Sequence, residues 1–215
     1  EMDQEAERLV AVLSEAREDA LLHGRDLGLR VDPRGYDWLK YDTRTDFTPI
    51  AQIAARFLKD ENGPIAAVMD VGGWDTHANQ GLEQGALARG LTALDNGIDA
   101  FKTEMGPAWR NTVVIIATEF GRTVAPNGAN GTDHGTAGAA FLAGGAAQGG
   151  RVLADWPGLA RGALYEERDL RPTTDLRAVF KGVLADHLRI STGALERDAF
   201  PDSGDARAAQ GLVRA

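Results

Sequence analysis

Several residue types and sequence patterns are absent from this 215-residue chain, and each absence excludes a class of function. There is no cysteine, which excludes thiolate metal sites, disulfides and thiol nucleophiles. No apolar run approaches the length of a membrane span, and we expect no signal peptide at the start of the chain. The chain also lacks the glycine-rich loops that bind phosphates or dinucleotides, and the Gly-x-Ser-x-Gly turn of serine hydrolases. The only serine of the first half, Ser14, lies in a helical pattern, so no hydroxyl nucleophile stands out.

The chain is acidic, with a formal net charge of -9, which argues against nucleic acid and anionic membrane surfaces as partners. A small anionic substrate is compatible with this charge, because a bound metal ion would invert the local field. The hydrophobic share of 43% is enough for the core of one globular domain, and the length does not suit two. Nothing in the composition points to a particular oligomeric state.

The two ends of the chain are predicted to lie outside the core of this single domain. Residues 1–46 are interpreted as an amphipathic helix followed by a polar loop, and residues 202–215 as a frayed tail. Because Glu1 already lies within the helical pattern, we expect the domain to lack its N-terminal part in this chain.

Three short apolar runs have the composition of strands that are buried on both faces. They are Ile65–Val71, Thr112–Ala117 and Ala139–Ala143. Amphipathic spacing predicts three helices around them, the first and the last capped by a threonine: Thr48–Lys59, Leu87–Met105 and Leu176–Leu188. A strand, a helix and a strand in this order favour a right-handed parallel unit. The predicted fold class is therefore α/β, with a mainly parallel sheet sandwiched by helices.

A glycine-rich turn follows the first predicted strand and carries an aspartate and a histidine two residues apart. In an extended segment Asp75 and His77 would point the same way, so both could face one metal ion. A carboxylate and an imidazole make half of a site for zinc or a similar ion. The alternative is structural: the aspartate caps the next helix and the histidine is hydrogen-bonded.

Further acidic and imidazole groups stand next to the second and third predicted strands. Glu119 ends an apolar run, where its carboxylate needs a partner, either a metal ion or the nearby Arg122. His134 lies in a glycine-rich loop and could be a ligand, a general acid–base group or a turn residue. Because the working groups of parallel sheets gather beyond the carboxyl ends of the strands, these signals together favour a metal site. The other histidines, His23 and His187, lie near helix ends and are interpreted as structural.

Four motifs together resemble a known family: Gly73-Trp-Asp-Thr-His77, Glu119-Phe-Gly-Arg-Thr123, Thr132-Asp-His-Gly135 and Arg168-Asp-Leu-Arg-Pro-Thr-Thr-Asp175. Over residues 47–190 the chain is similar to the bacterial family called domain of unknown function 1501, which is placed in the alkaline phosphatase and sulfatase superfamily. The resemblance implies an alkaline phosphatase-like fold, of which this chain would be the C-terminal portion and residues 47–190 the metal-site half. It also implies export to the periplasm, since members often carry a twin-arginine signal.

The same resemblance implies roles for the candidate residues. Asp75, His77 and His134 match the ligands of one divalent metal ion. Glu119 matches a ligand of a second ion, and Asp70 matches a residue that holds an accessory magnesium. Zinc is the favoured metal, with manganese, magnesium and calcium as alternatives.

The chain also departs from the superfamily pattern. Its metal-motif aspartate and histidine are two residues apart instead of four, and Phe120 stands where the second metal usually has a histidine. The superfamily's hydroxyl nucleophile belongs to an N-terminal strand that these residues do not include.

The function that the resemblance predicts is metal-dependent hydrolysis of phosphate or sulfate esters, with a small anionic ester as the substrate. Arg122 would steady the anion by bidentate contact. Because the nucleophile is missing, we expect this chain to be inactive on its own. The first alternative is a degenerate, non-catalytic protein of the same fold that binds a metal or an anion. The second is a structural partner domain that binds no metal.

Overall fold

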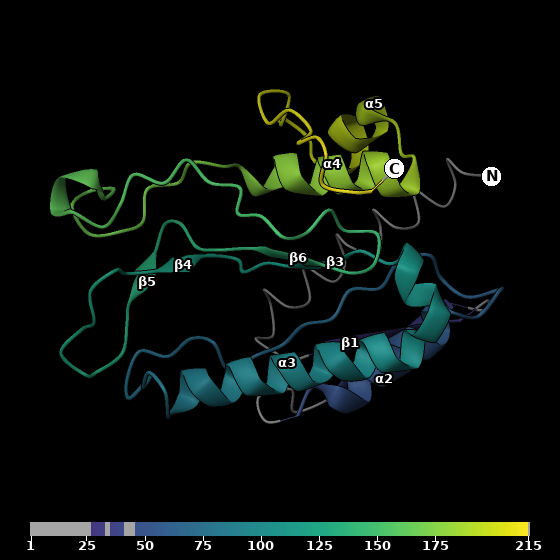
Figure 1. Ribbon diagram of the computed structural model, residues 1–215, viewed down its shortest axis with the longest axis horizontal. Helices are drawn as coiled ribbons and strands as arrows, with labels where there is room; N and C mark the ends of the chain where they lie inside the picture. Colours follow the sequence, from purple (N-terminus) through teal and green to yellow (C-terminus); the bar gives the residue numbers. More distant parts are fainter. Residues whose placement is uncertain (1–26, 33–34, 41–45, 215) are drawn as a thin grey trace. The chain divides into compact units, whose positions relative to one another are not determined.

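A computed structural model describes residues 27–32, 35–40 and 46–214 (Figure 1). The chain forms two compact units, which we call unit 1 (Glu1–Trp109 with Gly128–Gly131) and unit 2 (Arg110–Asn127 with Thr132–Ala215). The helix predicted near the start of the chain lies outside the described residues. Within the described part of the chain, no helix combines the length and the apolarity needed to cross a membrane.

Unit 1 contains the two helices that amphipathic spacing predicts, α2 (Thr48–Leu58) and α3 (Ala86–Met105). The Thr48 N–H donates to the Asp46 carboxylate at 2.9 Å, and a proline follows in the first turn. Both features favour the start of a helix. α3 ends at Gly106, whose φ of 53° lies in the left-handed region and stops the helix. The presence of both helices is confirmed, but Thr48 is the first residue of α2 and not its cap, since the capping position is Phe47 and no side chain caps the helix.

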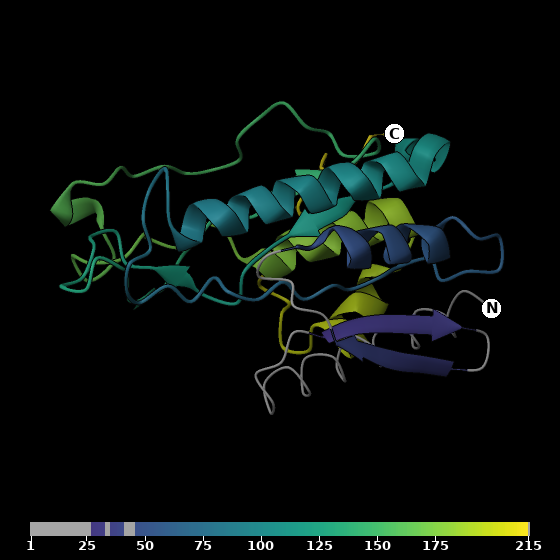
Figure 2. The same ribbon diagram turned by 90° about the horizontal axis from the view of Figure 1, so that it is seen from below.

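α2 and α3 lie side by side and form the core of unit 1 (Figure 2). This core consists of buried apolar side chains from both helices and from the residue before α2: Phe47, Ile50, Ala51, Ala55, Ala93, Phe101 and Met105. Near the end of the pair, the Lys59 ammonium lies 2.6 Å from the Glu104 carboxylate. Apolar burial, at about 25 cal/mol per Å², is the main interaction between the helices, and the partly exposed ion pair adds little.

A β-hairpin precedes α2 in a segment that the sequence analysis interprets as a loop. β1 (Leu27–Asp32) and β2 (Gly35–Lys40) pair antiparallel, with Leu29 opposite Trp38. The loop interpretation of these residues is therefore wrong. The polar residues that suggest a loop alternate with apolar ones such as Leu29 and Val31, and this period of two is typical of strands.

The first predicted strand, Ile65–Val71, forms no strand among the described residues apart from a single bridge position at Met69. Ile65 and Val68 are exposed, at 57% and 37%. An apolar run becomes a buried strand only where neighbouring strands pair with it and other elements cover its faces. This segment instead connects α2 to the glycine-rich loop that follows it.

Unit 2 contains two short antiparallel sheets (Figure 1). β3 (Val114–Ile116) pairs with β6 (Phe141–Ala143), and β4 (Gly121–Arg122) pairs with β5 (His134–Gly135). β3 and β6 lie within two of the predicted strands, so the presence of those strands is confirmed. Their pairing is antiparallel, a direction that an apolar run by itself does not fix. An α/β fold with a mainly parallel sheet stays a prediction.

The last predicted helix is present as α4 (Leu176–Leu188). Its cap is Asp175, whose carboxylate accepts a hydrogen bond from the Arg177 N–H at 2.8 Å, and not the predicted threonine. The buried residues of α4 are Lys181, Gly182 and Val183. The remaining helical segments are short: η1 (Gly106–Asn111), η2 (Arg161–Ala163), α5 (Thr192–Ala194) and η3 (Leu195–Ala199).

The end of the chain packs against α4, although the sequence analysis predicts a frayed tail from residue 202. Three tail residues are buried: Ser203, Ala206 and Leu212. The Ala209 N–H donates to the backbone of α4 at 2.8 Å. The fully buried Lys181 ammonium donates to the Ser203 carbonyl at 2.6 Å and to the Ala206 carbonyl at 3.0 Å. The prediction of a frayed tail is therefore wrong, because a buried ammonium needs acceptors and the tail supplies them.

Candidate metal centre

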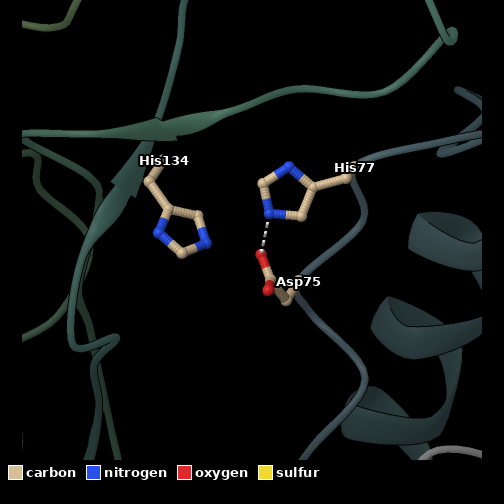
Figure 3. A group of neighbouring side chains, drawn as sticks. All are labelled: Asp75, His77 and His134. Carbon is tan, nitrogen blue, oxygen red and sulfur yellow. Dashed lines mark ion pairs between the residues drawn. The ribbon is translucent and has the colours of Figure 1, made fainter.

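An aspartate and a histidine meet in the glycine-rich loop of unit 1. His77 Nε2 lies 3.0 Å from Asp75 Oδ1, and about half of each side chain is exposed (Figure 3). Two backbone hydrogen bonds fold the loop tightly here, from Thr76 N–H to the Trp74 carbonyl at 2.9 Å and from His77 N–H to the Asp75 carbonyl at 3.3 Å. The structure thus brings together two of the residues predicted as metal ligands.

A second segment of unit 1 holds this loop in place. The backbone N–H groups of Asn79 and Gln80 donate to the carbonyls of residues 129–130 at 3.0 and 2.9 Å. Gly131 follows, and a β-carbon added to it would lie 2.2 Å from the His77 carbonyl carbon. Only glycine fits this close approach, so the segment fixes the position of the His77 backbone.

His134 lies in unit 2 on β5, where it is exposed and pairs across the hairpin with Arg122 of β4. Its ring stacks on the ring of Phe120, with the ring centroids 4.1 Å apart. Arg168 Nη2 lies 3.5 Å from the His134 backbone carbonyl. These contacts restrict both the ring and the backbone of the histidine.

Arg122, the predicted anion-binding residue, makes contacts within the protein. Its Nε donates to the Thr132 hydroxyl at 3.0 Å, and its Nη2 donates to the Thr132 carbonyl. Thr132 is buried, and Arg122 itself is half-buried. Because two donors of one guanidinium bind one residue, Arg122 holds the chain just before His134.

The other two predicted ligands, Asp70 and Glu119, are exposed. Among the described residues, neither belongs to a group of three or more side chains that could hold a metal ion. Glu119 lies in the bend between β3 and β4, and no ion pair joins it to Arg122 within the described part of the chain. The role of Glu119 as a ligand of a second metal ion stays a prediction.

Asp169 is a buried carboxylate, 2% exposed, to which the sequence analysis gives no role. Its Oδ2 accepts hydrogen bonds from the Thr136 N–H at 3.0 Å and from the Thr136 hydroxyl at 2.8 Å. Arg168 Nη2 donates to the same oxygen at 3.1 Å, and Arg168 Nε makes an ionic contact with Oδ1 at 2.9 Å that lacks hydrogen-bond geometry. Thr136 directly follows β5, the strand that carries His134. Through its hydrogen bonds, Asp169 therefore joins the end of this strand to Arg168.

The Asp169 carboxyl is ionised at neutral pH. Burial raises its pKa, but the hydrogen bonds from Thr136 and Arg168 outweigh burial and hold the pKa below its ordinary value. A signal for this residue exists in the sequence, since Asp169 belongs to one of the motifs that carry the family resemblance. The spacing alone does not reveal its contact with Thr136.

A sequence model of one protein family, described as protein of unknown function (DUF1501), matches residues 1–198. No curated protein and no solved structure matches the chain. The family match includes the loop of Asp75 and His77, the β4–β5 hairpin with His134, and the Arg168–Asp169 pair.

Proposed function

The chain belongs to the family of proteins of unknown function DUF1501, and from this premise we propose that it is a metal-dependent hydrolase of phosphate or sulfate esters. The proposed metal ligands are Asp75, His77 and His134, each of which offers one ligand atom (Figure 3). A carboxylate with two imidazoles suits zinc best, with manganese, magnesium or calcium as alternatives. The alkaline phosphatase-like fold and a periplasmic location belong to the same proposal, because both rest on the resemblance.

The observation that carries the proposal is the 3.0 Å distance between His77 Nε2 and Asp75 Oδ1. Two ligand atoms on one tetrahedral zinc ion lie roughly 3.4 Å apart, at bond lengths of about 2.0–2.2 Å. The pair therefore needs little movement to bind one ion. As a plain surface ion pair it would stabilise the fold by less than about 1 kcal/mol.

Chain connectivity supports His134 as the third ligand. Gly131 packs against the backbone of His77 in unit 1, and His134 follows only three residues later. Three residues span at most about 10–11 Å even when fully extended. His134 is therefore tethered to the loop that carries the other two ligands.

A divalent ion held by these residues would act as a Lewis acid and neutralise the oxygens of the ester. Three hydroxyls of the candidate motifs, on Thr76, Thr118 and Thr123, each donate to a neutral carbonyl oxygen, at 2.7, 2.9 and 3.0 Å. An activated nucleophile instead donates to a base, such as an imidazole or a carboxylate. We therefore expect this chain on its own to bind metal without rapid ester hydrolysis.

Phe120 favours a second candidate function, the non-catalytic binding of a metal or an anion by the same fold. By the family resemblance, Phe120 occupies the position where the second metal usually has a histidine. A phenyl ring cannot be a ligand, and this ring stacks on His134. A site with one metal can bind an anionic ester without supplying the second ion that superfamily catalysis uses.

Metal titration tests the proposed ligands. The purified chain is freed of metal by a chelator and titrated with Zn²⁺ and with Mn²⁺ in a calorimeter. We expect one zinc ion to bind, and the double variant Asp75→Ala/His77→Ala to lose binding with an unchanged circular dichroism spectrum. Asp186→Ala/His187→Ala removes the same residue types from α4 and should bind zinc like the parent protein. Equal zinc binding by both double variants would contradict the proposed site.

Ester hydrolysis separates the two candidate functions. The zinc-loaded chain should hydrolyse p-nitrophenyl phosphate and p-nitrophenyl sulfate no faster than buffer. Turnover that a chelator removes would instead make Thr76, Thr118 or Thr123 the first candidate nucleophiles. The hydrolase proposal requires metal-dependent turnover by the intact gene product. Its failure on a broad panel of esters would favour the binding protein.

A further inference from the structure

Two arginines of unit 2 contact the chain around His134. They differ in how far their guanidinium groups are still accessible to an external ligand. Arg122 uses its Nε and its Nη2 on Thr132 and is half-buried. The Arg168 side chain is 57% exposed, although it is held on one edge. An exposed and oriented guanidinium is better suited to an external ligand than one that is already engaged.

Asp169 holds Arg168 in this orientation. Its buried carboxylate contacts Arg168 Nε at 2.9 Å and Nη2 at 3.1 Å, on the same edge of the guanidinium. Nη2 also lies 3.5 Å from the His134 carbonyl. Among the described residues no hydrogen bond or ion pair involves Arg168 Nη1, so its two N–H donors are available to a further acceptor.

Hydrogen bonds from Thr136 reduce the share of the Asp169 negative charge that neutralises Arg168. The carboxylate shares its charge with the Thr136 N–H and hydroxyl, which donate to it at 3.0 and 2.8 Å. Arg168 therefore keeps part of its positive charge for another anion. Arginine binds the oxygens of phosphate and sulfate with a planar set of donors, and a fixed guanidinium loses little side-chain entropy on binding.

We infer that Arg168, positioned by Asp169, binds the tetrahedral oxyanion of the ligand, the role that the sequence analysis gave to Arg122. This inference rests on the proposed function, because the oxyanion is that of the phosphate or sulfate ester. It assigns Arg168 to ligand binding and Asp169 to positioning. Arg122 has a structural role in the hairpin.

Phosphate binding tests the inference. The zinc-loaded chain, with no free zinc present, is titrated with inorganic phosphate in a calorimeter. Arg168→Gln should weaken phosphate binding at least about tenfold, the effect of losing a hydrogen bond to a charged group, and should leave zinc binding within twofold. Arg168→Lys should retain part of the affinity, because it keeps the charge without the planar donors.

Arg177→Gln is the matched control. Arg177 also binds an aspartate through its Nε and Nη2, and its side chain is 41% exposed, but its partner Asp175 caps α4. This variant should bind phosphate like the parent protein. An equal loss of phosphate affinity in both variants would show that only the general surface charge matters, and would overturn the inference. Unchanged phosphate binding in Arg168→Gln would overturn it directly, and so would a parallel loss of zinc binding.

The failure of the proposed metal site would be visible separately, because zinc titration comes first. If the parent chain binds no zinc, the phosphate titrations are run on the metal-free proteins. A loss of phosphate binding in Arg168→Gln and not in Arg177→Gln would then support the inference without the metal. Equal phosphate binding in the two variants, or none by the metal-free parent protein, would overturn it.

Discussion

The ring of Phe120 stacks on the ring of His134, with their centroids 4.1 Å apart and their planes inclined by 29°. Phe120 lies in the bend before β4 and His134 lies on β5, so the hairpin itself brings the two rings together. Stacked aromatic pairs contribute about 0.5–1.5 kcal/mol beyond the area that they bury. This free energy can fix the orientation of the His134 ring as a metal ligand.

Replacing Phe120 should therefore weaken zinc binding without removing a ligand. We expect Phe120→Leu to lower zinc affinity by roughly three- to tenfold, because His134 must then give up ring freedom when it binds the ion. Phe141→Leu is the control, since Phe141 is an exposed phenylalanine on β6. Zinc titrations of both variants measure the difference. Tighter binding by Phe120→Leu would mean that the ring shields His134 from the metal.

Asp169 should make the stability of the protein depend on pH in the acid range. Its pKa is lowered in the folded protein, so it stabilises the fold fully above the unfolded value of about 3.9. This contribution falls as the pH drops through that value towards the folded pKa. Asp169→Asn should lose about 1–3 kcal/mol at neutral pH, because the buried group then lacks the negative charge that strengthens its hydrogen bonds with Thr136 and Arg168. Urea unfolding from pH 7 to pH 3 should show the gap to the parent protein narrowing, and a constant gap would contradict this account.

Lys181 should hold the end of the chain against α4. Its buried ammonium donates to the Ser203 and Ala206 carbonyls and to Glu196 Oε1, the last at 3.2 Å. Lys181→Met keeps most of the side-chain volume but leaves buried acceptors without a donor, at a cost of about 1–3 kcal/mol for each. We expect a lower free energy of unfolding and faster trypsin cleavage after Arg207. Lys102→Met, at an exposed position of α3, should change neither.

The helices could be predicted from the sequence because their signals are local. The apolar spacing of α2, α3 and α4 repeats within each helix and needs no distant partner. The strands were harder to predict, since β3 and β6 pair across residues far apart in the chain. An apolar run indicates a strand without its direction or partner, so the sequence did not predict that β3 pairs with β6 or that the pair is antiparallel.

In the candidate site, too, the sequence predicts contacts between neighbouring residues and not those between distant ones. The contact between Asp75 and His77 follows from a spacing of two residues, which the sequence displays directly. The contact of Asp169 with Thr136 joins residues 33 positions apart, and no local pattern encodes it. A buried lysine is rarer still, so Lys181 would not be placed in a core from sequence alone.

Gly182 on α4 should not tolerate a side chain, because the tail passes directly over it. A β-carbon added there would lie 2.0 Å from the Ala209 carbonyl oxygen, far inside van der Waals contact, and the atom in the way is backbone. Alanine normally stabilises a helix interior relative to glycine by about 1 kcal/mol, so the sign of the effect is diagnostic. Gly182→Ala should instead lower the free energy of unfolding by about 1–3 kcal/mol, as overpacking does. Gly193→Ala in α5, where nothing lies within 4 Å of the added carbon, should be neutral or stabilising. Stabilisation by Gly182→Ala in urea unfolding would mean that residues 203–214 do not pack on α4, and would return the tail to the frayed state that the sequence predicts.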